Sequence, residues 1–215
     1  KGAETVTIPK ADAMVSMGTM YSETVYTLLC YQYGVEPNSP ESLKNESIGK
    51  DFASMVVGGM QYSYYEEQNC EFMTAYIDKA NYLDLGVVSV QKVDAEELTK
   101  VMKAAKGEDK NVVYFGSGTR MSEEKYYNAN TEPCKKTGTY YEFLAPSTIN
   151  DVYSAIDVIG KVMGFDRKVI DEAIQDFPIR LYTIYNSVQE KTSGTTEKVK
   201  AYWEAANGKA VKSSM

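Results

Sequence analysis

A short loop rich in glycine and hydroxyl residues is the first candidate for chemistry. Gly116-Ser-Gly-Thr-Arg-Met121 follows an apolar run, and a glycine-rich turn after a buried strand is typical of sites that cradle a phosphate. The match is partial, because a third glycine is missing and the run is about the fourth expected strand. A plain turn is the other interpretation. In either case Arg120 stands at the carboxyl end of a strand, where its guanidinium could hold an anionic group through two hydrogen bonds.

Tyrosine is the second candidate, with 18 copies against one Trp. We expect three tyrosine clusters in loops, where such clusters are typical of binding surfaces. Single members could equally pack into the core with the hydroxyl at the surface. A phenolate could also ligate ferric iron, but it usually needs a carboxylate or histidine beside it, and spacing alone does not show one. The clusters are Tyr62, Tyr64 and Tyr65, then Tyr126 and Tyr127, then Tyr140 and Tyr141.

Several kinds of catalysis are excluded by residue type. The chain has no histidine, which removes Ser-His-Asp and Cys-His catalysis and HExxH zinc sites. Three acidic pairs remain, but adjacent residues do not face each other on a helix, so they are poor catalytic dyads. We therefore expect no enzyme, no resident metal ion and no cofactor. The pairs are Glu66-Glu67, Glu96-Glu97 and Glu123-Glu124.

The three cysteines form no CxxC pair. Cys30 lies on the apolar face of an expected helix, which predicts a buried thiol. Cys70 and Cys134 fall near polar segments and either pair with each other or stay free.

Composition limits the partners and the compartment. The 215 residues are 43% hydrophobic and 25% charged, with a net charge of −7, which is unlike the basic footprint of nucleic-acid binders. No run of 18 apolar residues occurs, so we expect no membrane span. The first residues, Lys1-Gly2-Ala3-Glu4, hold neither an initiator Met nor a signal-peptide core, which indicates a trimmed chain or a mature one whose signal peptide has been removed.

Alternating strands and helices must position these residues. Apolar runs predict strands and amphipathic spacing predicts helices. Because the two alternate at least three times, we expect an α/β fold with a Rossmann-like, mostly parallel sheet flanked by helices. The expected strands are 5–8, 13–17, 55–57, 85–90 and 111–115, and the expected helices run from Ser22 to Gly34, over 71–79 and over 94–106.

The second half of the chain reads as helical. Thr148 and Asp151 have capping-box spacing and open a helix that Gly164 ends. A long helix then follows from Asp166 and should kink at Pro178, and a last short helix is expected from Glu197 to Ala206. We divide the chain into an α/β lobe over 1–146, a helical backbone segment over 147–190, and a short helix with a polar tail over 191–215, the possible start of a truncated second lobe.

The order of these elements resembles that of a known family. Val6-Thr-Ile-Pro9, Met14-Val-Ser-Met-Gly18 and Ser22-Glu23 resemble the opening of ABC-transporter substrate-binding proteins for iron-siderophore, haem and cobalamin, the helical-backbone class III of periplasmic binding proteins. Val57-Gly58-Gly59 resembles the "VGG" before a cleft loop. The resemblance spans residues 5 to about 190. Its last motif begins with Ala145-Pro-Ser-Thr-Ile-Asn-Asp-Val-Tyr153 and continues through Ile159-Gly160 to Met163-Gly164.

This resemblance implies an extracytoplasmic component of an ABC importer, periplasmic or lipid-anchored at the cell surface. It would capture an iron chelate (siderophore), haem or a corrinoid for delivery to a permease. Family members that bind bare zinc or manganese use histidine, so its absence favours a bulky chelated ligand held by aromatic rings and arginine. The family has two lobes joined by a long helix, and we expect one lobe plus that helix here, with the second lobe missing. The expected ligand-binding residues are Thr19, Tyr21, Tyr62, Tyr64 and Arg120.

Two alternatives stay open. One is a structural or interaction module that keeps one lobe of this fold without capturing a ligand. The other is a nucleotide-binding α/β enzyme that uses the loop at Gly116.

Overall fold

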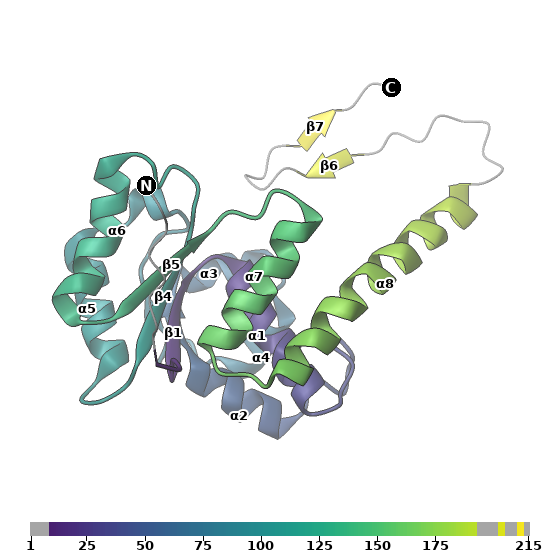
Figure 1. The fold of residues 1–215 in the computed structure, drawn as a ribbon, viewed down its shortest axis with the longest axis horizontal. Coiled ribbons are helices and arrows are strands. Elements are labelled where there is room, and N and C mark those ends of the chain that lie inside the picture. Colours follow the sequence, from purple (N-terminus) through teal and green to yellow (C-terminus); the bar gives the residue numbers. More distant parts are fainter. Residues whose placement is uncertain (1–8, 193–201, 205–209, 213–215) are drawn as a thin grey trace. The chain divides into compact units, whose positions relative to one another are not determined.

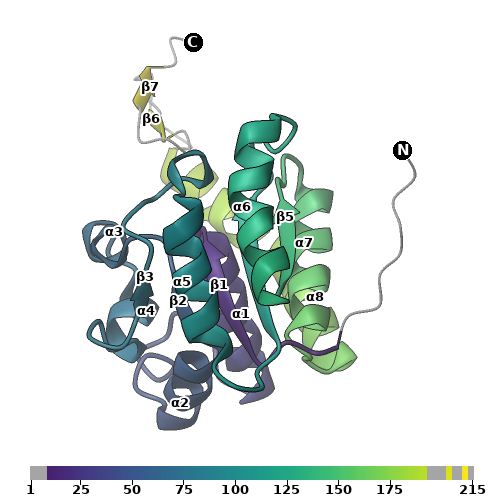
Figure 2. The same cartoon turned by 90° about the vertical axis from the view of Figure 1, so that its left-hand side faces the viewer.

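The computed structural model describes residues 9–192, 202–204 and 210–212. Their central feature is a five-stranded sheet in which every neighbouring pair is parallel, in the order β3-β2-β1-β4-β5 (Figures 1 and 2). This confirms the expected α/β, Rossmann-like class. The strands are β1 Ala13–Met17, β2 Val56–Gly59, β3 Leu83–Asp84, β4 Val112–Ser117 and β5 Tyr140–Leu144.

Helices cover both faces of the sheet. α5 and α6 pack together on one face, while α1 packs against α2 and α7 on the other (Figure 1). The strands β1 and β4 lie between these layers, and every residue of β1 is buried. The helices are α1 Thr19–Gln32, α2 Glu46–Met55, α3 Tyr62–Glu67, α4 Glu71–Tyr76, α5 Ala95–Lys106, α6 Glu124–Thr137, α7 Ile149–Val162 and α8 Arg167–Thr192, and η1 Val90–Lys92 is a short 3₁₀ turn.

Local chemistry explains where several helices begin. The side chain of Asp94 accepts hydrogen bonds from the amides of Glu96 and Glu97 and starts α5, as polar N-caps do. Thr148 and Asp151 form the expected capping box: the Thr148 side chain accepts from the Asp151 amide at 3.2 Å, and Asp151 accepts from the Thr148 amide at 2.8 Å. The predicted starts of these two helices are confirmed.

Other boundaries differ from the expectation. α1 begins at Thr19 rather than Ser22, because the hydroxyl of Ser22 turns inward to that of Ser16. α2 lies in a stretch that its polar composition left unassigned, and Asn45 caps it. The segment expected to be a strand over 85–90 is not one, because β3 already ends at Asp84 and Gly86 turns with a φ of 67°.

The tyrosine clusters lie in regular elements instead of loops. Tyr62, Tyr64 and Tyr65 belong to α3, Tyr126 and Tyr127 to α6, and Tyr140 and Tyr141 to β5. A helix as short as α3, a helix as polar as α6 and an edge strand such as β5 lack the apolar periodicity that would identify them in a sequence.

The chain divides into two compact units, Lys1–Ile174 and Gln175–Met215, so the division falls inside α8. The first unit holds the whole five-stranded sheet together with α7. In the second, Tyr202–Glu204 and Ala210–Lys212 pair as antiparallel strands β6 and β7. The helix expected over 197–206 is therefore wrong at 202–204, and the rest of it lies outside the described residues, as does the strand expected over 5–8.

Candidate functional site

The strand order creates a switch point at the carboxyl end of the sheet. From β1 the chain moves outward to β2 and β3 on one side, and from β4 it moves to β5 on the other. Neighbouring connections therefore diverge between β1 and β4, where Met17 pairs with Gly116. Open α/β sheets bind their ligands outside the carboxyl ends of the strands at this kind of point. Thr19 follows β1 and Arg120 follows β4, so the fold brings these two expected site residues to the same edge.

The loop after β4 exposes Arg120, while the amides of Gly118 and Thr119 form hydrogen bonds to β5 and within the loop. The amide of Gly118 donates to the Leu144 carbonyl at 2.8 Å, and the amide of Thr119 donates to the Ser117 hydroxyl at 3.3 Å. Arg120 has a positive φ of 60°, which is uncommon for a residue other than glycine. Its side chain is 58% exposed and lies 3.7 Å from Glu123.

Tyr21 lies in the core, not on a ligand-facing surface. Its ring stacks on Phe115 with centroids 5.3 Å apart, and only 2% of the residue is exposed. The hydroxyl donates to the Gly116 carbonyl at 2.5 Å and lies 3.2 Å from the Leu144 carbonyl. Burial raises the pKa of this phenol, so the hydroxyl stays protonated. Tyr21 therefore joins the carboxyl ends of β4 and β5 to the first turn of α1.

Tyr62 is also a core residue, with 4% exposure. Its hydroxyl lies 3.0 Å from the Ile77 carbonyl, while its backbone amide donates to the Asp84 carboxylate at 2.8 Å. Tyr62 thus fastens α3 to the chain after α4 and to the end of β3. Like Tyr21, it supports the site without facing it.

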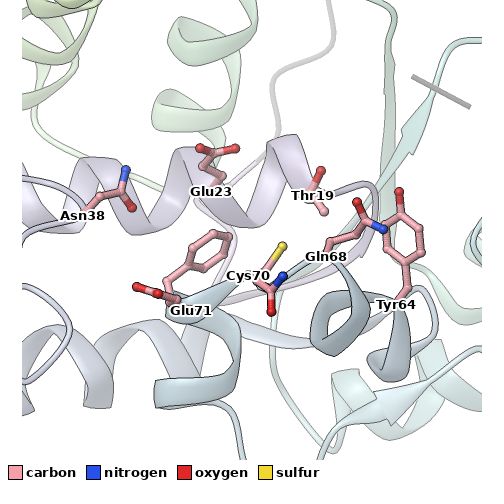
Figure 3. Close-up of a pocket in the computed structure, with 9 residues that line it drawn as sticks. Thr19, Glu23, Asn38, Tyr64, Gln68, Cys70 and Glu71 are labelled. Atoms are coloured by element: carbon pink, nitrogen blue, oxygen red, sulfur yellow. The ribbon is translucent and has the colours of Figure 1, made fainter. Parts of the chain in front are cut away.

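Thr19 and Tyr64 meet at a groove of about 440 Å³. Figure 3 shows Thr19, Glu23 and Asn38 in a row along the α1 side and a second row opposite them, from Tyr64 past Gln68 and Cys70 to Glu71. The sulfur of Cys70 points toward α1 (Figure 3). The groove starts at the carboxyl ends of β1 and β2, because α1 and α3 follow those strands directly.

Three polar side chains of this groove are not used by the described part of the fold. Within the described residues, the hydroxyls of Thr19 and Tyr64 and the Gln68 side chain have no hydrogen-bond partner, in contrast to the hydroxyls of Tyr21 and Tyr62. Free donors and acceptors along a concave wall are available to a ligand. Of the five expected residues, the structure brings Thr19 and Tyr64 into one groove and leaves Arg120 on the adjoining loop.

Two titratable groups that line the groove, Glu23 and Cys70, have a raised pKa. Glu23 reaches solvent, but the walls displace water from it and raise the pKa of its carboxyl. Burial, with a smaller contribution from the Glu23 charge, raises the pKa of the Cys70 thiol. Sequence reasoning missed both as site residues. A signal for Glu23 was present, since it is the one charged residue in the stretch that forms α1.

The three cysteines lie in different surroundings. None of the three forms a disulfide. Cys30 is buried as expected, and Cys134 lies inside α6, where burial raises its pKa to about 12. Among the described residues, no group of three or more Cys, Asp or Glu could hold a metal ion. No helix in that part of the chain has both the length and the apolar character needed to cross a membrane.

Comparisons of the chain with protein-family models, with curated proteins and with solved structures give no match.

Proposed function

We propose that this chain is a substrate-binding component of an ABC importer. In this proposal it is extracytoplasmic and captures an iron chelate, haem or a corrinoid at the carboxyl edge of its sheet for delivery to a permease. The observation that carries the proposal is the groove of about 440 Å³ beside the switch point, where the side chains of Thr19, Tyr64 and Gln68 bond to none of the described residues. The motif order noted in the sequence, from Val6 to Tyr153, supports the same family of binding proteins.

The site favours binding over chemistry. Its polar side chains are two carboxylates, hydroxyls, amides and one thiol. Burial raises the pKa of that thiol, and a protonated thiol is a poor nucleophile. A volume of this size is at the small end of ligand pockets, which run from about 300 to 1,000 Å³. A bulky chelate would therefore fill the groove with one part and cover the adjoining loop of Arg120 with another.

The nucleotide alternative finds less support in the loop after β4. A phosphate-cradling loop aims several backbone amides at its ligand. Here the amides of Gly118 and Thr119 donate within the loop and to β5. ATP, NAD and FMN should accordingly fail to protect the protein against thermal unfolding.

The proposal is tested by titrating the purified chain with ferric siderophores, haem and cobalamin, with thermal unfolding and visible absorbance as readouts. A ligand at 100 times its dissociation constant should add about 2.7 kcal/mol to the free energy of unfolding. Tyr64→Ala should weaken binding at least about fivefold, as loss of a contact residue worth more than 1 kcal/mol does. Arg120→Gln should weaken binding of an anionic chelate in the same assay.

Matched controls separate the site from general effects. Tyr33→Ala removes an exposed tyrosine of the α1 terminus that lies outside the groove, and Lys50→Gln removes an exposed charge on α2. Both should bind as the unchanged protein does. If none of the chelates, haem or cobalamin shifts the unfolding temperature, the transport proposal is wrong and the interaction module becomes the better interpretation.

A further inference from the structure

The groove beside α1 carries an unbalanced charge. Its lining contains two carboxylates, Glu23 and Glu71, and no Lys or Arg. Lys79, the basic residue that follows α4, already pairs with Glu66 at 2.7 Å and lies over the ring of Tyr62. A ligand that enters the groove therefore meets negative charge without a compensating cation on the walls.

Glu23 is the centre of this charge. Its carboxylate has no ion pair or hydrogen bond within the described residues, although the groove walls partly desolvate it. A cation that approaches a partly desolvated carboxylate is attracted to it more strongly than to one in bulk water. The nearest titratable groups of the opposite wall, the Cys70 thiol and the Glu71 carboxyl, cannot supply that cation.

The remaining walls suit an alkyl arm that ends in a donor. The rings of Tyr64 and Phe72 line the side opposite α1, and apolar chains pack against such rings. The hydroxyl of Thr19 lies on the same face of α1 as Glu23, one helical turn away, and both point up from the helix in Figure 3. A group that donates several hydrogen bonds could therefore use both oxygens.

We propose that the groove binds the protonated amine arm of a ligand, with Glu23 as the counter-ion of a primary ammonium. Thr19 accepts a second hydrogen bond from the ammonium, and the alkyl chain lies against Tyr64 and Phe72. The proposal rests on the proposed function only for the rest of the ligand, namely the chelate core outside the groove. It predicts that a carboxylate in place of the ammonium is rejected.

The direct test uses small probes and does not depend on iron. Pentylammonium, pentanol and pentanoate are titrated into the ¹⁵N-labelled full chain, and the amide shifts of Thr19, Tyr64 and Gln68 are followed. Pentylammonium should give saturable shifts at these residues and pentanoate none. Glu23→Gln should weaken pentylammonium about tenfold, the effect expected of a charge-assisted hydrogen bond. Glu67→Gln, which removes an exposed carboxylate of α3 outside the groove, should leave its affinity unchanged.

Two outcomes overturn the inference. One is pentanol binding as tightly as pentylammonium at the same residues. The other is Glu23→Gln and Glu67→Gln behaving alike. Because Glu23→Gln keeps the shape of the side chain, its folding can be verified from the same spectra, and a loss of affinity then reports the charge.

A matched pair of chelates separates this inference from the proposed function. Ferrioxamine B carries a free terminal ammonium, whereas the ring-closed ferrioxamine E carries none. The unchanged protein should prefer ferrioxamine B about tenfold, and Glu23→Gln should lose most of this preference. Equal binding of both chelates by the unchanged protein, with no ammonium shifts, keeps the proposed function and removes the inference. Ammonium shifts without binding of either chelate remove iron-chelate capture and keep the amine site.

Discussion

Tyr21 shows how one hydroxyl can hold the edge of the sheet together. It donates to the buried Gly116 carbonyl at 2.5 Å, so Tyr21→Phe leaves that acceptor without its partner. Such a loss costs about 1–3 kcal/mol, and we expect a drop of that size in the free energy of unfolding by urea. Tyr64→Phe is the control, because the Tyr64 hydroxyl bonds to none of the described residues and its removal should cost close to nothing. Equal stabilities of the two variants would contradict the role given to Tyr21.

Glu23 should make stability depend on pH in a direction that identifies it as a site residue. Its pKa is raised in the folded chain, so the folded state binds this proton more tightly than the unfolded state. Stability from this group therefore falls as the pH rises above the unfolded value of about 4.3. Glu23→Gln removes the titration and should be more stable than the unchanged protein at pH 7, with an advantage that vanishes below about pH 4. Urea unfolding at both pH values measures this.

Two results for Glu23→Gln would contradict this prediction. An equal stability at pH 7, or an advantage that persists at low pH, would mean that the carboxylate is well solvated and carries no penalty. A residue that lowers stability but raises affinity for a cation is what a binding site requires.

Single residues also mark the limit of the sequence reasoning. Composition and loop position indicated Thr19, Tyr64 and Arg120, which do lie at the carboxyl edge, but could not distinguish them from Tyr21 and Tyr62. The difference depends on contacts with Gly116 and Ile77, which are distant in sequence. Only the folded register of α1 and α3 determines which tyrosines turn inward.

At the scale of elements, β1 and β2 approach so closely that β2 needs a glycine at position 59. Gly59 has a φ of 149°, and a β-carbon there would lie 2.0 Å from the Ser16 carbonyl oxygen. Gly59→Ala should therefore cost at least about 3 kcal/mol, from backbone strain and overlap together. Gly86→Ala is the matched control, because its φ of 67° is also strained while its surroundings are open. It should cost about 1–2 kcal/mol. Urea unfolding curves of similar midpoint for both variants would argue against this close approach.

Elements with strong local signals were predicted correctly and those without them were not. The sequence alone shows the apolar runs of β1 and β4 and the N-cap of α5 at Asp94. β3 has two residues and α3 has six, which is too short for a periodic pattern to appear. Their positions depend on the pairing of Gly58 with Leu83 and on the Asp84 carboxylate, both of them tertiary contacts.

At the scale of the whole molecule, net charge should influence which ligands reach the groove. The chain carries 30 acidic and 23 basic residues, a net charge of −7, and such a field attracts cationic ligands over distances that salt shortens. The Debye length falls from about 30 Å at 0.01 M salt to about 8 Å at 0.15 M. Affinity for ferrioxamine B should therefore fall several-fold over this range, while affinity for the neutral ferrioxamine E should not change.

The Glu23→Gln variant divides this salt effect into its two sources. The salt dependence that the variant retains reports the field of all other charges, and the part that it loses reports the contact with Glu23. Because Glu23 lies inside the groove and is partly desolvated, salt should screen its contact less than the long-range field. We therefore expect the variant to lose most of the affinity measured at 0.15 M salt but to keep much of the slope against salt concentration. Isothermal titration at several NaCl concentrations measures both quantities, and a slope that disappears with Glu23 would show that the net charge of the molecule plays no part.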